Sequence, residues 1–469
     1  MTPKVFRTAL LLACAAGMAA GGATPAFAAD DDKALAAPLP ANDQQQQAQP
    51  AAVAPSGGDQ ASTTTDADQG GGTDILSGDT LSVLLDGRLV LANGERSFTK
   101  RGLGKTRFGG TTDGDYKAYA VPVEADLIWT PRFTNTLSAN VSAAWQRDQE
   151  NAADLIEAFV NWLPPQTGPV GVQVRAGLMW PEISLEHSTG GAWSVVDTIT
   201  PSAINSWVGE EVKVVGLEGT IRTDIGGNTV GLTGAAFGFN DTSGTLLSFR
   251  GWALHDEKAT AFGHFKLPPL NSFMTFAQAN ETRSLLEIDN RPGWYARLDW
   301  RASAPWGAAL FYYDNRGDPK AVNPSLQWGW RTRFWDLAFD ADLDSKTRLL
   351  AQAMTGSTIM GFSENDVPWV HTKFSSAYVM LSHRLTDKWN VAGRVEAFRT
   401  REHGSEMSPL DSEDGWSWTA ALKYLLNDHV TLKAEALNVR SKRGVRLTDL
   451  GIDPFQAQTV LQFAVQVRL

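Results

Sequence analysis

Cysteine is almost absent from the sequence: its single example, Cys14, lies within the first 28 residues. In that stretch Lys4 and Arg7 precede a short apolar run that ends at Ala28, an arrangement typical of a secretory signal peptide cleaved after Ala28. A mature chain that starts there has no cysteine, which excludes disulfides as the framework of its fold. Two alternatives stay open: a membrane anchor, and a lipoprotein cleavage site at residues 11–14 that leaves Cys14 lipidated.

Long hydrophobic runs are also missing after the signal, although 43% of the residues are hydrophobic. A helix needs about 20 consecutive apolar residues to cross a bilayer. If the mature chain spans a membrane, it must therefore do so with strands. The charge balance excludes a further class of partner: the net charge of −11 becomes −13 once Lys4 and Arg7 are removed, which argues against nucleic acid.

Aromatic residues are lacking between Phe27 and Phe98. Residues 29–79 are rich in Ala, Gln, Pro, Asp, Gly and Thr, a composition that cannot bury enough apolar surface to offset the entropy of ordering. We predict that this stretch, which follows the signal peptide of residues 1–28, is a disordered periplasmic leader. It serves either as a plain tether or as a segment that binds peptidoglycan or a partner.

From residue 80 to residue 469 the sequence alternates between apolar and polar residues with a period of two, in segments of roughly 10 to 13 residues, the length of a tilted membrane strand. In the first clear segment one face carries Tyr119, Val121, Val123, Ala125, Leu127 and Trp129. In the next it carries Leu137, Ala139, Val141, Ala143 and Trp145. Only residues 131–135 separate the two segments, so we predict a tight reversal between antiparallel strands.

The connections between such segments alternate in length along the chain. Short ones contain Pro, Gly, Asn or Asp, and the long ones are polar. Short turns on the periplasmic rim and long loops outside are typical of a transmembrane antiparallel up-and-down β-barrel, an all-β fold, for which we predict 16 to 18 strands. The predicted long connections are 92–116, 148–153, 181–210, 240–257, 283–291, 315–324, 357–372, 401–414 and 441–456.

A soluble all-β domain also has alternating strands, so a second signal is needed to separate the two folds. Trp residues recur at segment ends, at Trp129, Trp145, Trp162, Trp180, Trp300 and Trp416, where the aromatic girdles of a membrane barrel lie. The last segment, residues 459–469, keeps an apolar face up to the final Leu469. This ending resembles the closing strand of outer-membrane porins, which usually end in Phe or Trp.

Several short motifs carry a family resemblance. Residues 175–187, RAGLMWPEISLEH, resemble the strand-to-loop passage of the phosphate-selective porin family and related proteobacterial porins, and residues 200–203, 207–211 and 216–218 fit the same pattern. The resemblance implies a homotrimer in the outer membrane of a Gram-negative cell, in contact with lipid. It also implies a water-filled barrel for small hydrophilic solutes or ions, with a loop folded inward.

We predict that the segment 181–210 is this constriction loop, which sets the narrowest part of the pore. The alternative is an ordinary outer loop with solvated charges. The candidate residues of the constriction are Glu182, Glu186, His187, Trp193, Asp197, Glu210 and Glu211.

Charged residues that share the polar phase of the strands are predicted to line the pore, because an Arg on the lipid face costs about 2 to 4 kcal/mol at mid-bilayer. Each of them can instead serve as a wall residue in a cross-strand pair. Gln327, Arg331 and Arg333 share one phase and Asp336 and Asp340 the other, so a bulge near Phe334 or a misplaced strand end is needed. The predicted lining is Arg88, Glu124, Asp126, Glu157, Arg175, Glu218, Arg222, Arg297, Asp299, Arg301, Arg331, Arg333, Arg394, Glu396, Lys433 and Glu435.

Acidic groups on the loop that face Arg on the wall would create a transverse field and mild ion selectivity. A phosphate filter would instead need cations crowded at the constriction, which the acidic loop does not supply. In a carbohydrate-selective pore, Trp193 and Trp207 would stack on sugar faces, although such aromatics also anchor loops.

An enzyme is the competing class of function. The sequence has no G-x-S-x-G motif, and its seven His fall in no metal-ligand spacing, so we predict no catalytic residues, no metal and no cofactor. A barrel hydrolase with a site formed by separate strands stays the alternative. An energy-coupled receptor would need a folded plug domain, for which the leader is too short.

Overall fold

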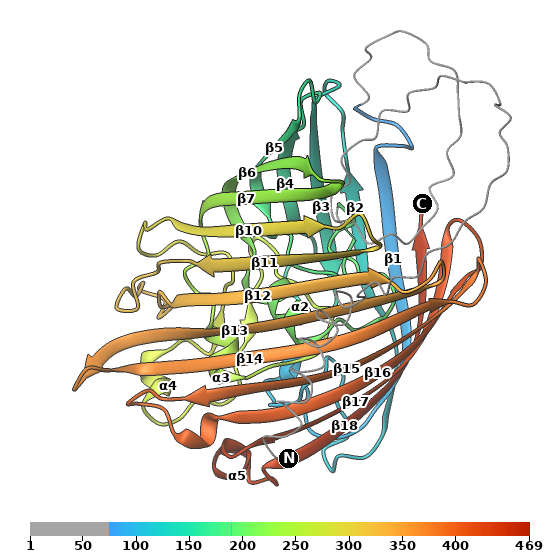
Figure 1. Ribbon diagram of the computed structural model, residues 1–469. Coiled ribbons are helices and arrows are strands. Elements are labelled where there is room, and N and C mark those ends of the chain that lie inside the picture. The colour runs from blue at the N-terminus through green and yellow to red at the C-terminus, as the bar shows by residue number, and fades with distance from the viewer. Residues whose placement is uncertain (1–74, 189) are drawn as a thin grey trace, which may run out of the picture.

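The computed structural model describes residues 75–188 and 190–469, so the predicted signal peptide and nearly all of the predicted leader lie outside the described residues. Sixteen antiparallel strands form a closed barrel (Figure 1). Strand β1 (Leu81–Ala92) pairs with both β2 (Lys117–Trp129) and β18 (Phe455–Arg468), so that the first and last strands close the wall. The predicted up-and-down barrel is confirmed, at the lower limit of the predicted strand number.

The other strands follow one another around the wall, except that β7 is followed by β10. Their bounds are β3 (Leu137–Gln146), β4 (Asp154–Trp162), β5 (Val170–Met179), β6 (Val214–Ile225), β7 (Asn228–Gly238), β10 (Gly293–Arg301), β11 (Trp306–Asp314), β12 (Arg331–Asp342), β13 (Thr347–Glu364), β14 (Val367–Arg384), β15 (Trp389–Glu402), β16 (Glu413–Leu425) and β17 (Val430–Arg443).

Two predicted loops differ from the structure. The predicted loops 240–257 and 283–291 belong to one insertion, residues 239–292, which contains α3 (Thr245–Phe249), α4 (Met274–Ala277) and a two-stranded sheet of β8 (Phe265–Lys266) and β9 (Glu281–Thr282). The predicted loop 357–372 is a hairpin, because β13 and β14 continue to Asn365 and Asp366, which both have a positive φ. Such left-handed residues form the tight turn that a two-residue hairpin requires.

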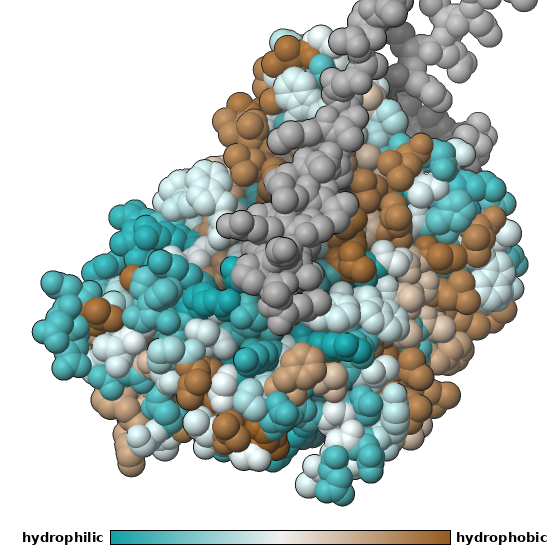
Figure 2. All heavy atoms as spheres, turned by 60° about the horizontal axis from the view of Figure 1, so that its bottom comes forward, coloured by the Kyte–Doolittle hydropathy of each residue, from teal (hydrophilic) through white to brown (hydrophobic). Residues whose placement is uncertain are grey.

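The outward face of the wall is apolar where the strands run without interruption. Large hydrophobic side chains such as Leu89, Leu298, Leu337, Val395 and Leu461 point outward and are exposed. Figure 2 shows hydrophobic side chains grouped over the outer strand surface and hydrophilic ones gathered on the left, at the end with the long loops. Among the described residues, no helix is both long and apolar enough to cross a bilayer.

The predicted alternation holds in β3 and in β18 but inverts within β2. Glu124 pairs with Asp86 and Pro122 pairs with Gly87, so Val123 is an extra residue in a β-bulge. A bulge exchanges the two faces of a strand from that point onward. The predicted outward position of Leu127 is therefore correct, whereas Tyr119 points inward and donates a hydrogen bond to the carbonyl of Gly109 (2.7 Å).

The inside of the barrel is packed with side chains. Inward residues from nearly every strand and residues of the inserted segments form one buried apolar cluster. At its centre the Trp207 ring lies 5.3 Å from the ring of Phe334, 5.2 Å from that of Phe374 and 6.0 Å from that of Trp252. Aromatic side chains in such contact exclude water from that part of the interior.

The Trp residues at the strand ends divide into two groups. Trp162 and Trp300 point outward and are more than 40% exposed, as expected for a girdle at the membrane interface. Trp180 differs from the prediction: it is buried and its ring stacks on that of Trp193, with the ring centres 4.8 Å apart. The chain has already left β5 at that point and turned into the barrel, so Trp180 cannot reach lipid.

Candidate functional site: the inward segment and the barrel wall

The segment between β5 and β6 folds against the inward face of the wall and ends in α2 (Ala203–Glu211), in which every residue is buried. Ser202 begins this helix, and its side chain accepts a hydrogen bond from the backbone N–H of Asn205. An N-cap of this kind satisfies one of the free donors of the first turn. The helix lies inside the barrel outline (Figure 1), and its N-cap satisfies a free N–H group of its first turn.

Glu186 fixes the middle of the segment to the wall. Its carboxylate lies 2.7 Å from Arg394 of β15 and accepts hydrogen bonds from the Ser202 hydroxyl (2.6 Å) and from the Asn205 amide (2.6 Å). Arg394 also lies 3.1 Å from Glu396, whose second oxygen accepts a hydrogen bond from the backbone N–H of Ala203 (2.7 Å). All three charged groups are buried, so this triad holds the segment and does not face water.

A second set of wall charges binds the backbone that precedes α2. Glu435 accepts hydrogen bonds from the N–H groups of residues 199 and 200, and Lys433 donates to the carbonyls of residues 195 and 198. Asp197 lies 3.0 Å from Lys423. These predicted pore-lining residues do point inward, but their polar atoms are used by the inserted segment.

The predicted residues at the end of α2 are buried among the inserted segments. Glu210 pairs with Arg250 (2.6 Å) and His255 (3.0 Å), which both belong to the 239–292 insertion. Glu211 accepts a hydrogen bond from the N–H of Leu246 (2.9 Å) in α3, and another from the Trp207 indole (2.7 Å). Both carboxylates therefore join the two insertions to each other.

Next to β18 on the wall, the 239–292 insertion contacts β1 and β2. Arg88 pairs with Asp86 (2.8 Å) and with Asp256 of the insertion, and Glu124 lies 2.6 Å from Lys258. Asp126 and Glu157 also point inward and are buried. The predicted inward phase of these residues is correct for every member named here.

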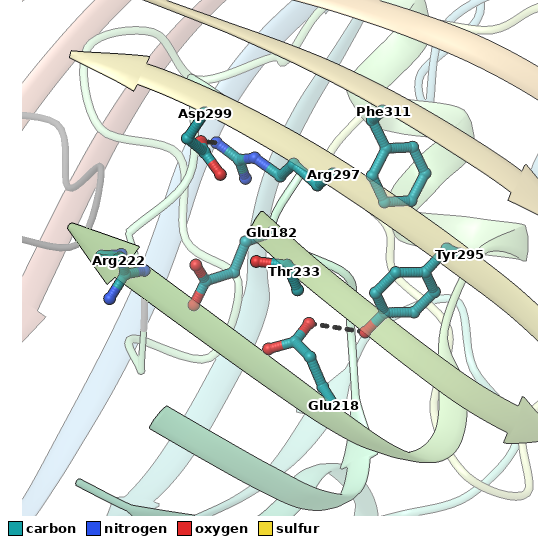
Figure 3. Close-up of a pocket in the computed structure, with 8 residues that line it drawn as sticks. All are labelled: Glu182, Glu218, Arg222, Thr233, Tyr295, Arg297, Asp299 and Phe311. Atoms are coloured by element: carbon teal, nitrogen blue, oxygen red, sulfur yellow. Dashed lines mark hydrogen bonds and ion pairs between the residues drawn. The ribbon is translucent and has the colours of Figure 1, made fainter. Parts of the chain in front are cut away.

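One charged region of the inner wall stays accessible to water. It is a narrow cavity of about 10 Å³, room for about one water molecule, that we call the wall cavity. Figure 3 shows the carboxylate of Glu182, from the inward segment, between Arg222 on one side and Arg297 with Asp299 on the other. Glu218, Thr233, Tyr295 and Phe311 complete its lining.

The charges of the wall cavity are held in pairs. Arg175 binds Glu218 through two hydrogen bonds of 2.6 and 2.9 Å and also lies 3.1 Å from Glu182, and Arg297 lies 2.7 Å from Asp299. Arg222 donates a hydrogen bond to Gln173 (3.2 Å) and makes no ion pair among the described residues. Further along the wall, Arg301 pairs with Asp340 (2.9 Å) and is 38% exposed.

Arg331 and Arg333 correct the predicted lining. Both are exposed and alternate with buried Thr332 and Phe334, so they lie on the outward face of β12. The pairing of β12 with its neighbours has no bulge. Arg331 and Arg333 therefore point away from the inward face that carries Asp336. They can do so because β12 extends past the hydrocarbon layer at its outer end, where an outward Arg meets polar surroundings.

The alternative in which sugars stack on Trp193 and Trp207 is not compatible with the surroundings of these rings. Trp193 lies between Trp180 and His187, with its ring centre 4.3 Å from that of His187, and Trp207 is 1% exposed. Both rings are occupied by protein groups on their faces or edges. They anchor the inward segment.

Sequence reasoning missed the cations of the inserted segments. They contact inward carboxylates or buried carbonyl groups and thereby close the interior: Lys105, Arg107, Lys213, Arg250 and Lys258. These residues lie in irregular chain, where no periodicity marks a buried side chain. The 239–292 insertion has no excess of cations over carboxylates, so its composition does not mark them either.

Among the described residues, one carboxylate cluster, in the 239–292 insertion, could hold a metal ion. It consists of Asp241, Glu287 and Asp289. Asp241 accepts hydrogen bonds from the N–H groups of Ile288 (2.5 Å) and Asp289 (3.1 Å), and Glu287 accepts one from Phe239 (2.8 Å). These bonds fix the loop, and burial raises the pKa of Asp241 to about 6.

Comparison with known proteins agrees with this geometry. Residues 289–469 match the model of the family described as "Putative beta-barrel porin-2, OmpL-like". The outer-membrane channel DcaP of Acinetobacter baumannii has a similar fold, with a TM-score of 0.50, 9% sequence identity, and coverage of 84% of this chain and 99% of that one. The chain thus has the fold of outer-membrane β-barrel channels, and its last part is similar to a porin family.

Two further solved structures resemble the barrel. The anion-selective porin from Comamonas acidovorans is 10% identical, with a TM-score of 0.45 over 83% of this chain and 99% of that one. OprB of Pseudomonas putida is 9% identical, with a TM-score of 0.46 over 83% and 94%. No curated protein matches the sequence. The predicted resemblance to outer-membrane porins is confirmed, and selectivity for phosphate stays an untested alternative.

Proposed function

We propose that the barrel is a passive channel for small hydrophilic solutes or ions, and that its path runs along the wall cavity past Glu182. The observation that carries the proposal is the position of this carboxylate. It is 29% exposed on the inward segment and faces the Arg residues of the wall. A carboxylate opposite guanidinium groups creates a transverse field, as a constriction requires.

The charge balance of the wall cavity supports mild selectivity. The lining carries Glu182, Glu218 and Asp299 against Arg222 and Arg297, and Arg175, which contacts Glu182 from behind the lining, makes the two signs equal in number. A phosphate filter would need an excess of donors to replace the hydration of the anion. We therefore favour a general ion and solute channel over a phosphate-selective one.

The narrow cavity predicts small conductance in the state described here. Because there is room for about one water molecule, a hydrated solute passes only when the chain around Glu182 moves away from the wall. Segments held by few buried apolar contacts open most easily. Ile183 and Leu185 belong to the buried apolar cluster, so the part of this stretch that moves most easily is the Glu182 side chain itself.

Planar bilayer recordings test the proposal. Purified protein should give stepwise openings, and their reversal potential across a salt gradient should report weak selectivity. Folded protein that inserts but stays silent at all voltages would refute a channel. We also propose a homotrimer, on the resemblance to porins, and native mass spectrometry in detergent should give three chains per assembly.

A hydrolase is the alternative function, and one contact bears on it. Ser184 and His187 lie within hydrogen-bond distance, with 2.8 Å between the Ser hydroxyl oxygen and the His Nδ1. Among the described residues no carboxylate bonds to that ring, and its face is stacked on Trp193. A nucleophile needs a base that is itself oriented by a third group. We propose that the protein is not an enzyme, and purified protein should not hydrolyse esters.

A further inference from the structure

The outward surface of the barrel has a polar hollow near the rim with the long loops. It has a volume of about 490 Å³ and spans β11 to β15, and we call it the outer-wall hollow. The loops 315–330 and 403–412 lie beside it, which places it at the extracellular end. Its outward lining consists of Tyr312, Arg333, Trp335, Thr355, Ser357, Lys373, Ser375, Arg399 and Arg401.

Small side chains between large ones produce the hollow. The pairing of the strands places Thr355 opposite Ser375, and Ser357 opposite Lys373. On one side of these short side chains stand the rings of Tyr312 and Trp335, 4.6 Å apart, and on the other side stand Arg residues of β15. The depression is therefore built into the wall by sequence, and no flexible loop has to form it.

The charge of the hollow is strongly positive. Arg399 and Arg401 share one carboxylate, Asp414, at 3.4 and 2.7 Å. Arg333 and Lys373 are exposed and make no ion pair among the described residues. Four cations against one carboxylate leave a net charge of +3 on a surface that faces away from the pore.

The depth of the hollow places these cations at the level of lipid headgroups. Trp335 and Tyr312 form part of the aromatic girdle, and the next outward pair of residues, Leu310 and Leu337, is more than 40% exposed on the apolar wall. Trp and Tyr mark the boundary between hydrocarbon and headgroups. The cations on the loop side of this boundary therefore meet the charged part of the outer leaflet.

We propose that the outer-wall hollow binds the phosphorylated headgroup of an anionic lipid of the outer leaflet. Arg333 and Lys373 would contact phosphate oxygens, because an Arg guanidinium group can bind phosphate through two parallel hydrogen bonds. The acyl chains would lie over the leucines of the apolar wall. A second copy of the chain is a poorer occupant, because the outward wall that it would present is apolar and would not neutralise these cations.

The test measures lipid retention by the intact protein in non-ionic detergent, with diphosphorylated lipid A as the probe and native mass spectrometry as the readout. The double variant R333Q/K373Q should bind lipid A at least about tenfold more weakly than the unchanged protein. The matched control K346Q/K388Q removes two cations from the short turns at the other rim and should bind as the unchanged protein does.

Three further outcomes decide the proposal. Dephosphorylated lipid A should bind to the unchanged protein as weakly as lipid A binds to R333Q/K373Q, which identifies the phosphate groups as the recognised part. Equal retention of lipid A by both double variants would overturn the proposal. A loss of the oligomer in R333Q/K373Q, with lipid retention unchanged, would also overturn it and assign the surface to a second copy.

Discussion

Glu182 and Arg175 lie 3.1 Å apart across the gap between the inward segment and the barrel wall. Arg175 is buried and already bound to Glu218 by two hydrogen bonds, so it stays in place without the loop. Among the described residues Glu182 has no other ion pair, and its side chain is partly exposed to water. The pair therefore joins a fixed partner to a movable one, and the selectivity and opening of the channel should both depend on the movable one.

Replacement of Glu182 by Gln should shift the ion preference towards anions. The change removes the one carboxylate that the inward segment contributes to the wall cavity. Glu218 and Asp299 then stand against Arg175, Arg222 and Arg297, so one cation is in excess. The reversal potential across a KCl gradient measures this shift. An unchanged reversal potential in a folded, conducting variant would show that the path does not run past Glu182.

Replacement of Glu186 by Gln is the matched control, because the same chemical change falls on a buried group. Ion preference should stay as it is, whereas the inward segment should loosen. Arg394 keeps Glu396, so we expect a cost of about 1 to 3 kcal/mol for the lost charged contacts. Faster protease cleavage within residues 181–202 should accompany larger current fluctuations. A shift in ion preference equal to that of E182Q would contradict the division of roles.

The 239–292 insertion should be held most firmly against the rest of the barrel at low pH. Burial, followed by the nearby carboxylates of Asp289 and Glu287, raises the pKa of Asp241 to about 6 from the ordinary value of 3.8. A group with a raised folded pKa favours the docked loop below the ordinary value, and this contribution is lost as the pH rises through about 6. Protease cleavage within 239–292 should increase from pH 5 to pH 7.5.

The variant D241N isolates this titration, because an amide oxygen can still accept the hydrogen bonds from Ile288 and Asp289. Its cleavage should depend on pH only as the protease itself does. The same rise in cleavage for D241N and the unchanged protein would assign the pH dependence to another group.

The sequence could predict the barrel because every strand whose outer face contacts lipid must alternate apolar and polar residues. In β18 the outward Leu461, Phe463 and Val465 and the inward Gln462 follow the predicted phase residue by residue. The predicted assignment of inward and outward residues is wrong on one side of Val123, because a β-bulge adds one residue to the strand and leaves no mark in the composition. The inward position predicted for Arg331 is also wrong. Beyond the bilayer the strand still alternates, but an outward charge there is no longer costly.

The candidate site could be predicted only in part, for a different reason. A position on the inward face follows from period two, and the inward charges of β15 and β17 were predicted in this way. Which of them contact water depends on irregular segments that fold into the lumen. Glu396 and Glu435 are buried because residues 199–203 donate backbone N–H groups to them, and local pattern does not encode such long-range contacts.

Replacement of Trp207 by Ala should open the packed interior. This side chain contacts Trp252, Phe334 and Phe374 at the centre of the buried cluster, and its loss should cost about 3 to 5 kcal/mol of packing. The weakened contact between α2 and the wall should give larger conductance steps. W207F keeps a ring in the cluster but loses the hydrogen bond to Glu211, so its effect should be smaller. The control W300A removes an outward Trp of similar size and should leave conductance unchanged. Equal conductance for W207A and W300A would mean that the packed cluster does not limit the channel, and that ions pass by the wall cavity alone.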